Sequence, residues 1–216
     1  MSTALVITSS ALGEASVSSH LVQEAVSCLL TRNSQLRIVT RDLGESPVPH
    51  LDIDSIMAFG GAEPKSEAQA TARTLSDDLI VELEAADTII IGAPMYNFGM
   101  PSTLKAWFDY VLRAGITFRY TESGSIGLLK NKRALVIASR GGLYSEGPAQ
   151  MMDSQEPHLR NLLKFMGISD VTFIRVEKLA FGAEAREQAI ATARQLIEEY
   201  TETHPVGRPE AIPIGP

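Results

Sequence analysis

The chain has 216 residues, 44% of them hydrophobic, and its 19 Lys and Arg against 26 Asp and Glu give a net charge of −7. A single domain of this length can bury about 70% of its unfolded surface. The acidic balance argues against a nucleic-acid partner, because phosphate backbones select clustered basic residues. No apolar run approaches the roughly 20 residues that span a bilayer, and no basic segment precedes the first apolar run as in a signal peptide.

Cysteine and histidine are sparse. The single cysteine, Cys28, excludes an intrachain disulfide and fits a reducing compartment. The histidines form no cluster that would predict a metal site, and none has a nucleophile at a recognisable spacing. We therefore expect a soluble, cytoplasmic protein with no membrane partner and no metal.

Five apolar segments, each expected to be a strand, alternate with helical patterns. They are Leu5–Thr8, Arg37–Thr40, Thr88–Gly92, Ala134–Ser139 and Val171–Val176. Apolar residues at helical spacing predict five helices between and after these strands, one opening after Pro101 and one ending at Gly167. Strict alternation of strand and helix predicts an α/β fold, in which helices cover both faces of a parallel sheet.

Two connections are longer than a turn requires. Leu43–Ser66 contains three prolines and should be an ordered excursion or a mobile flap, and Gly115–Lys130 should be a hairpin or a large loop. Residues 1–200 read as a single domain. Thr201–Pro216 holds four prolines, and we expect this tail to lack a fixed fold.

A serine-rich loop follows the first strand. Five of the eleven residues in Ser9–Ser19 are serines, placed just ahead of a helix. Helix N-terminal amides and hydroxyls together form an anion site, and a phosphate monoester is the expected ligand. The alternative is that Ser16 simply caps the helix. The glycine motifs of dinucleotide-binding folds and of P-loops are absent.

Two further loops follow the third and fourth strands. Pro94–Gly99 places aromatic residues between prolines, although its large side chains could also be ordinary core. Ser139–Gly142 ends in paired glycines, which allow close backbone approach to a ligand; alternatively it is a plain turn with Arg140 in a surface ion pair. In a flavodoxin-like strand order, 2-1-3-4-5, all three loops converge at one edge of the sheet. Such an edge suits a flavin.

The combination of motifs resembles the FMN-dependent NADH-azoreductase family, whose members are flavodoxin-like NADH:quinone oxidoreductases. The motifs are Ser10 with Ser16-Val17-Ser18, Pro94-Met95-Tyr96-Asn97-Phe98, Phe118-Arg119-Tyr120 and Ser139-Arg140-Gly141-Gly142. The second motif, which continues through Lys105, is the most specific of them.

The resemblance implies an FMN site built from three groups of residues. Those expected to hold the phosphate are Ser10, Ser16, Val17 and Ser18. Those expected to line the isoalloxazine are Met95, Tyr96, Asn97 and Phe98. Those expected to border its other polar edge are Ser139, Arg140, Gly141 and Gly142.

The resemblance also implies a homodimer, in which the substrate pocket includes Asn97, Tyr120 and Phe165. Phe165 falls about 110° around its helix from the apolar stripe, at 3.6 residues per turn. It therefore needs cover from outside its own core, which a second chain would supply, unless it is a singly exposed phenylalanine. Residues 56–62 lack the arginine that some relatives place over the pocket, so their substrate preference does not transfer.

The expected activity is a ping-pong transfer of hydride from NADH, with NADPH as the alternative donor, through FMN to a quinone or an azo compound. The cofactor carries this chemistry, and no dedicated catalytic residue is expected. Tyr120 should stack rather than donate a proton, since tyrosine has an ordinary pKa near 10. Two alternatives stay open: a flavodoxin-type electron carrier without its own small-molecule substrate, and a flavin-free scaffold.

Overall fold

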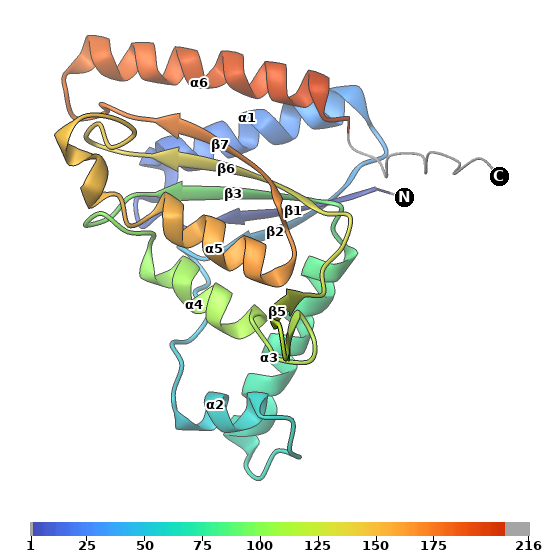
Figure 1. Cartoon of the computed structure of the whole chain (residues 1–216). Coiled ribbons are helices and arrows are strands. Elements are labelled where there is room, and N and C mark those ends of the chain that lie inside the picture. Colours follow the sequence, from blue (N-terminus) through green and yellow to red (C-terminus); the bar gives the residue numbers. More distant parts are fainter. Residues whose placement is uncertain (1, 206–216) are drawn as a thin grey trace.

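The computed structural model describes residues 2–205, and its centre is a sheet of five parallel strands. These strands are β1 (Thr3–Thr8), β2 (Arg37–Asp42), β3 (Thr88–Pro94), β6 (Arg133–Ser139) and β7 (Asp170–Val176). Their order is β2-β1-β3-β6-β7, which is the predicted flavodoxin-like order (Figure 1). All five predicted strands are confirmed, each longer by one or two residues than expected.

Helices cover both faces of the sheet, as predicted. One face carries α1 (Val17–Arg32) and α6 (Ala183–Thr203). The other carries α3 (Glu67–Ala85), α4 (Ser102–Val111) and α5 (Glu156–Met166). The molecule therefore has three layers, and the carboxyl ends of all five strands lie at one edge (Figure 1).

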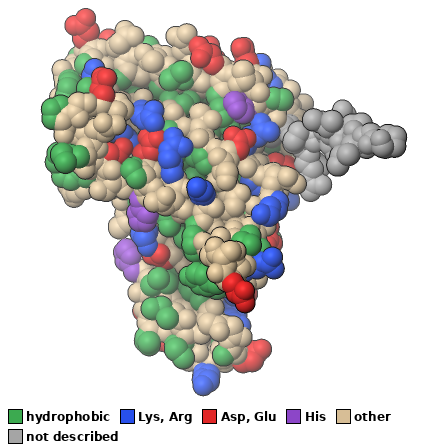
Figure 2. All heavy atoms as spheres, in the orientation of Figure 1, with side chains coloured by type: hydrophobic (Ala, Val, Ile, Leu, Met, Phe, Trp, Pro, Cys, Tyr) green, Lys and Arg blue, Asp and Glu red, His purple; other side chains and the backbone are tan. Residues whose placement is uncertain are grey.

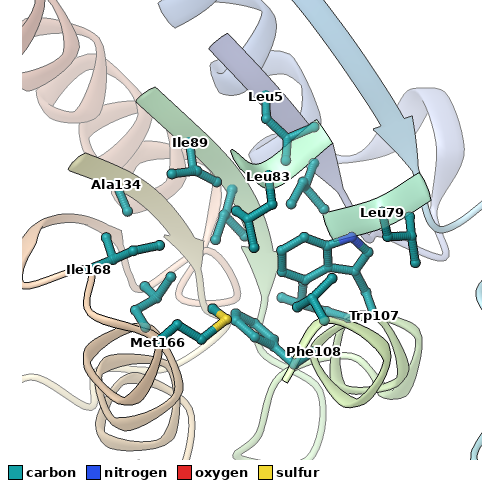
Figure 3. Packing of buried hydrophobic residues seen from close by; sticks show 14 of the residues in the cluster. Leu5, Leu79, Leu83, Ile89, Trp107, Phe108, Ala134, Met166 and Ile168 are labelled. Atoms are coloured by element: carbon teal, nitrogen blue, oxygen red, sulfur yellow. The ribbon is translucent and has the colours of Figure 1, made fainter. Parts of the chain in front are cut away.

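Residue alternation along the strands divides the core between the two faces. Leu5 of β1 packs with α3 and α4, whereas its neighbour Val6 packs with α1 and α6, because successive strand side chains point to opposite faces. Figure 3 shows the first of these clusters, in which Trp107 and Phe108 of α4 lie beneath the strands. Strands buried on both faces explain the unbroken apolar runs of the sequence.

The excursion over 43–66 is ordered and contains a helix that the periodicity did not predict, α2 (Ile53–Phe59). Asp52 begins it with a capping box, since its carboxylate accepts from the Ser55 amide at 2.8 Å. Arg73 of α3 donates to carbonyl groups of α2 and of the residues after it. Together α2 and α3 project below the sheet, and α2 exposes several apolar side chains there (Figure 2).

The second long connection contains a β-hairpin, one of the two expected alternatives. Its strands are β4 (Phe118–Thr121) and β5 (Gly124–Gly127). The base of the hairpin packs against the end of α5, where a Cβ added at Gly127 would lie 2.1 Å from the amide nitrogen of Gly167. Gly167 itself ends α5 at a φ of 102°, as the sequence predicted.

The last helix runs past the expected domain boundary. Because α6 continues to Thr203, and Thr201 is buried, the prediction of an unstructured tail from residue 201 is wrong for its first three residues. Most of that predicted tail, residues 206–216, lies outside the described residues. Among the residues that the structure describes, no helix is long and apolar enough to cross a membrane.

Candidate functional site

The loops after β1, β3 and β6 meet at the carboxyl edge of the sheet and are joined by hydrogen bonds. The phenolic oxygen of Tyr96 lies 3.2 Å from the Ser10 hydroxyl and accepts from the Ala11 amide at 3.0 Å. The amide of Met95 donates to the Ser139 carbonyl at 2.8 Å. The predicted convergence is therefore present in a single chain.

A cavity of about 290 Å³ lies between these loops. Its lining combines hydroxyls, backbone groups, apolar side chains and two arginines, with no carboxylate. The lining residues are Ser10, Leu12, Ala15, Ser16, Val17, Pro94, Met95, Tyr96, Ser139, Arg140, Gly141, Leu179, Ala180 and Arg186. Five of the eight FMN-binding residues expected from the first two loops line the cavity, and so do three of the four expected from the third loop. The expected residues that do not line it are Ser18, Asn97, Phe98 and Gly142.

The serine loop both caps α1 and faces the cavity, so its two interpretations are compatible. Ser16 accepts from the Ser19 amide at 3.2 Å and lines the cavity. Ser18 is fully buried, with its hydroxyl 3.2 Å from that of Ser16. Gly44 supports the loop from below, because a Cβ there would lie 2.2 Å from the Ser10 carbonyl oxygen.

The aromatic loop contains a tight turn with left-handed backbone. Tyr96 and Gly99 exchange hydrogen bonds at 3.0 and 3.1 Å, and between them Asn97 and Phe98 have φ values of 49° and 71°. A positive φ is costly for a bulky residue, and such strain clusters at functional sites. The ring of Phe98 is 40% exposed and packs edge-to-face on Tyr144, 6.0 Å away.

The third loop presents amides that have no partner in the described part of the chain. These are the amides of Gly141 and Gly142, and the Asn97 amide of the neighbouring loop is also free. The loop is fixed from behind, since its carbonyl groups accept from Leu179 at 3.2 Å and Ala180 at 3.0 Å. Fixed free donors at the edge of a cavity suit a ligand with carbonyl or anionic oxygens.

The side chain of Arg140 is used within the protein and not for a ligand. It is buried and lies 3.0 Å from the Asp153 carboxylate, 3.2 Å from that of Glu177 and 3.6 Å from that of Glu156. The alternative of a surface ion pair is wrong, because the carboxylates come from separate elements that enclose the guanidinium. The expected place at the flavin edge can apply only to the Arg140 backbone, which borders the cavity with Gly141.

This ion cluster lowers the pKa of two of its carboxyl groups. Burial raises the pKa of Glu156, but hydrogen bonds from Arg175 and Arg160 outweigh it and hold the pKa below its usual value. Burial also raises the pKa of Glu177, and hydrogen bonds from the Ser145 hydroxyl, the Tyr144 amide and Arg140 lower it further than burial raises it. Both groups are therefore charged at neutral pH, which keeps Arg140 neutralised.

The other two predicted pocket residues lie away from the cavity. Phe165 contacts Phe118 with ring centroids 4.5 Å apart, and Tyr120 contacts Phe118 at 5.4 Å; we call these three residues the aromatic cluster. The start of α5 is at the site, where Gln155 donates to the Ala93 carbonyl. Ten residues of helix then separate Phe165 from the site, which is about 15 Å at 1.5 Å per residue.

The cover of Phe165 therefore comes first from its own chain. The sequence predicted that a second chain would cover this ring, and within one chain Phe118 of the hairpin already lies against it. Phe165 is still only half-buried, and Tyr120 is 73% exposed. Within one chain, the structure does not bring Asn97 together with Tyr120 and Phe165.

Three of the lining residues lie outside the three predicted loops. Leu179 and Ala180 follow β7, and Arg186 lies in the first turns of α6. The rule that places ligands at the carboxyl ends of strands could have pointed to the loop after β7. Arg186 carries no motif, so nothing in its local sequence marked it.

The residues present fit an FMN molecule. Hydroxyls at the start of α1 suit its phosphate, apolar and aromatic groups around Met95 suit a flat ring, and free amides suit the polar ring edge. Among the described residues, no group of three His, Cys, Asp or Glu side chains could hold a metal ion.

Comparison with known sequences finds relatives that align with almost the whole chain. Residues 2–201 match a family model described as a flavodoxin-like fold. An FMN-dependent NADH:quinone oxidoreductase of Hyphomonas neptunium is 53% identical over 203 residues, covering 94% of this chain and 97% of the relative. A protein with the same description from Azotobacter vinelandii is 48% identical, covering 92% and 99%.

Solved structures are similar over the same range. The crystal structure of an azoreductase from Bacillus anthracis has a TM-score of 0.87 at 24% identity, covering 94% of this chain and 100% of that one, and this similarity concerns the fold. A crystal structure of an FMN-dependent NADH-azoreductase from Bacillus anthracis in complex with FMN has a TM-score of 0.83 at 25% identity, covering 92% and 99%.

Proposed function

Because the chain belongs to the flavodoxin-like family of FMN-dependent NADH:quinone oxidoreductases, we propose that it uses FMN to pass two electrons from NADH to a quinone or an azo compound. The observation that carries this proposal is the cavity at the carboxyl edge of the sheet, which three hydrogen-bonded loops enclose. NADH is the proposed donor, and NADPH is the alternative that kinetics must separate.

The residues proposed to bind FMN divide by their chemistry. Ser10 and Ser16, with the backbone at Val17 and the hydroxyl of Ser18 beside them, would hold the phosphate at the start of α1. Met95 and Tyr96 would lie against the ring, with Asn97 and Phe98 at its exposed side. The backbone of residues 139–142 would meet the polar ring edge, where the free amides of Gly141 and Gly142 support an acceptor-rich ligand.

FMN, when bound, supplies the hydride chemistry, in two half-reactions that share one binding place for donor and acceptor. The protein supplies position and electrostatics. Fixed amides near Asn97 and Gly141 would stabilise negative charge on the polar edge of the ring without having to reorient. Pro94 is buried and Met95 is half-buried, so these two residues would form an apolar wall behind the ring.

A homodimer is proposed to complete the substrate pocket. The aromatic cluster lies about 15 Å along α5 from the cavity of its own chain, so it can border a flavin only on a second copy. Support for this comes from Tyr120, which is 73% exposed, and from the apolar side chains Ile53, Ile56 and Met57, which are exposed on α2. The cytoplasm is the proposed location, since Cys28 is the only cysteine.

The test is reconstitution followed by kinetics. The flavin-free protein is incubated with FMN, desalted, and assayed with NADH and NADPH against menadione and an azo dye. We expect a yellow protein that oxidises NADH only when an acceptor is present, with parallel double-reciprocal lines as in ping-pong kinetics. A protein that stays colourless would contradict the proposal and favour the flavin-free scaffold.

An electron carrier of the flavodoxin type is the second candidate, because it would have the same fold and cofactor. A carrier passes single electrons to protein partners and has no small-molecule substrate of its own, so kinetics can separate it from the proposed enzyme. A yellow protein that does not oxidise NADH with menadione, yet exchanges single electrons with a redox protein, would decide for the carrier.

A further inference from the structure

We propose that Arg186 is a binding residue for the phosphate of FMN, and that it supplies the one uncommitted positive charge at the cavity. This inference rests on the proposed function, because it concerns how the same site holds its cofactor. Serine hydroxyls and helix amides alone can bind a phosphate. Arg186 would add a full charge that the serine loop lacks.

The charges around the cavity leave Arg186 available for an anion. Two of its lining residues are cations, Arg140 and Arg186, and none is a carboxylate. Arg140 is neutralised by the carboxylates of Asp153, Glu156 and Glu177. Arg186 has neither an ion pair nor a side-chain hydrogen bond among residues 2–205.

Arg186 shares the cavity with the start of α1. The cavity lining joins Arg186 with Ala15, Ser16 and Val17, the residues at the start of α1. The hydroxyls and amides there mark the end of the cavity that suits a phosphate. Gly141 offers a neutral backbone donor, which suits the polar edge of the ring instead.

Hydrogen bonds hold the backbone of Arg186 and of the connection before it in place. The connection from β7 to α6 is fixed to the third loop, since the amides of Lys178, Leu179 and Ala180 donate to carbonyl groups of residues 140–142 at 2.9–3.2 Å. The helix then begins, and the Arg186 amide donates to the Gly182 carbonyl at 3.1 Å. The long side chain of Arg186 is exposed and can move toward a ligand in the cavity, while its backbone stays fixed.

The chemistry favours a phosphate as the partner. A phosphate monoester carries about −1.5 to −2 charges at pH 7, and the chain as a whole has a net charge of −7, so the ligand approaches a protein that repels it. A guanidinium matches phosphate oxygens in a forked, charge-assisted geometry. Riboflavin has the same ring as FMN and no phosphate, so a comparison of the two ligands isolates the contribution of the phosphate to binding.

The experiment measures binding, not turnover. The flavin-free full-length protein is titrated with FMN and with riboflavin by flavin fluorescence, at low and high NaCl. The variants are Arg186→Ala, Arg186→Lys and the control Arg194→Ala, which removes a cation two turns further along α6 that pairs with Glu24. Circular dichroism checks that each variant folds.

Arg186→Ala should weaken FMN binding about tenfold, as for a charged hydrogen bond, and leave riboflavin binding unchanged. Arg186→Lys should retain most of the affinity, Arg194→Ala should retain all of it, and NaCl should weaken FMN binding less in Arg186→Ala than in the wild type. Equal FMN affinity in Arg186→Ala and the wild type, or an equal loss for both ligands, would overturn the inference alone. A wild-type protein that binds neither ligand would overturn the proposed function together with it.

Discussion

Tyr96 and Ser10 are 86 positions apart in the chain, yet their hydroxyl oxygens lie 3.2 Å from each other at the edge of the sheet. The same Tyr96 oxygen accepts from the Ala11 amide. This one phenol therefore joins the serine loop to the aromatic loop.

Removing the Tyr96 hydroxyl should weaken the link between the two loops without creating a cavity in the core. Tyr96→Phe should lower FMN affinity severalfold and lower the unfolding free energy by about 1 kcal/mol, the typical net value of a hydrogen bond. Fluorescence titration and urea unfolding measure the two effects. Tyr200→Phe is the matched control, because the buried Tyr200 hydroxyl has no hydrogen-bond partner among residues 2–205. An equal loss of FMN affinity in both variants would contradict the role of Tyr96.

Gly44 should be intolerant of any side chain. A Cβ at this position would lie 2.2 Å from the Ser10 carbonyl, so Gly44→Ala must displace the serine loop and should weaken FMN binding at least tenfold while lowering stability by about 1–3 kcal/mol. Gly60→Ala is the control, since its nearest atom would be 3.6 Å away. The measurements are FMN titration and thermal unfolding, and wild-type FMN affinity in Gly44→Ala would refute the prediction.

Asn97 has a φ of 49°, so two substitutions can test its backbone conformation and its side chain separately. Asn97→Val should reduce FMN retention strongly, because a β-branched residue resists this conformation at a cost of about 1–2 kcal/mol. Asn97→Gly should keep the turn and lose only what the amide side chain contributes. Flavin content after gel filtration reports both variants, and full retention in Asn97→Val would count against a site built on this turn.

Stability should fall in acid as the carboxylates around Arg140 become protonated. The folded-state pKa of Glu156 and of Glu177 is lowered, so their stabilising contribution is complete above the unfolded value of 4.5 and is lost as the pH falls below it. Urea unfolding between pH 7 and pH 3 should show this decline. Glu177→Gln should lose about 1–2 kcal/mol at pH 7 and flatten the profile.

The control for this pH experiment is Glu202→Gln. Glu202 pairs with Arg32, but the two side chains are 62% and 43% exposed, so the loss should stay below about 1 kcal/mol. A profile for Glu177→Gln as steep as that of the wild type would show that the ion cluster does not set the acid limit.

Phe165→Ala should alter the acceptor kinetics far more than FMN binding, provided a second copy brings the aromatic cluster to the flavin. We expect the KM for menadione to change severalfold, with FMN affinity within twofold of wild type. Phe173→Ala is a suitable control, since Phe173 is also half-buried but packs under Arg160. Unchanged acceptor kinetics in Phe165→Ala would remove this residue from the pocket, and a monomer by analytical ultracentrifugation would remove the whole dimeric pocket.

Strands and layers could be predicted from the sequence because strands buried on both faces leave unbroken apolar runs, of which Thr88–Gly92 is the clearest. The meeting of the three loops followed from strand order alone. The helix α2 was missed because it is only seven residues long and lies between prolines, although Asp52 is a favoured N-cap residue.

The fate of Arg140 could not be predicted, because its partners lie 13 to 37 positions further along the chain and meet it only in the folded protein. The same holds for Phe118 and Phe165, whose contact joins a hairpin to the end of a helix. Side-chain pairings between distant elements have no periodic signal, whereas element types and their order do.

The ion cluster around Arg140 consists of protein groups only. The conformation of the backbone after Arg140, at Gly141 and Gly142, is therefore fixed when the chain folds. The Gly141 and Gly142 amides should therefore keep their places after the flavin departs. FMN that returns to the empty protein would then meet its backbone donors already in place, and rebinding would require no folding step.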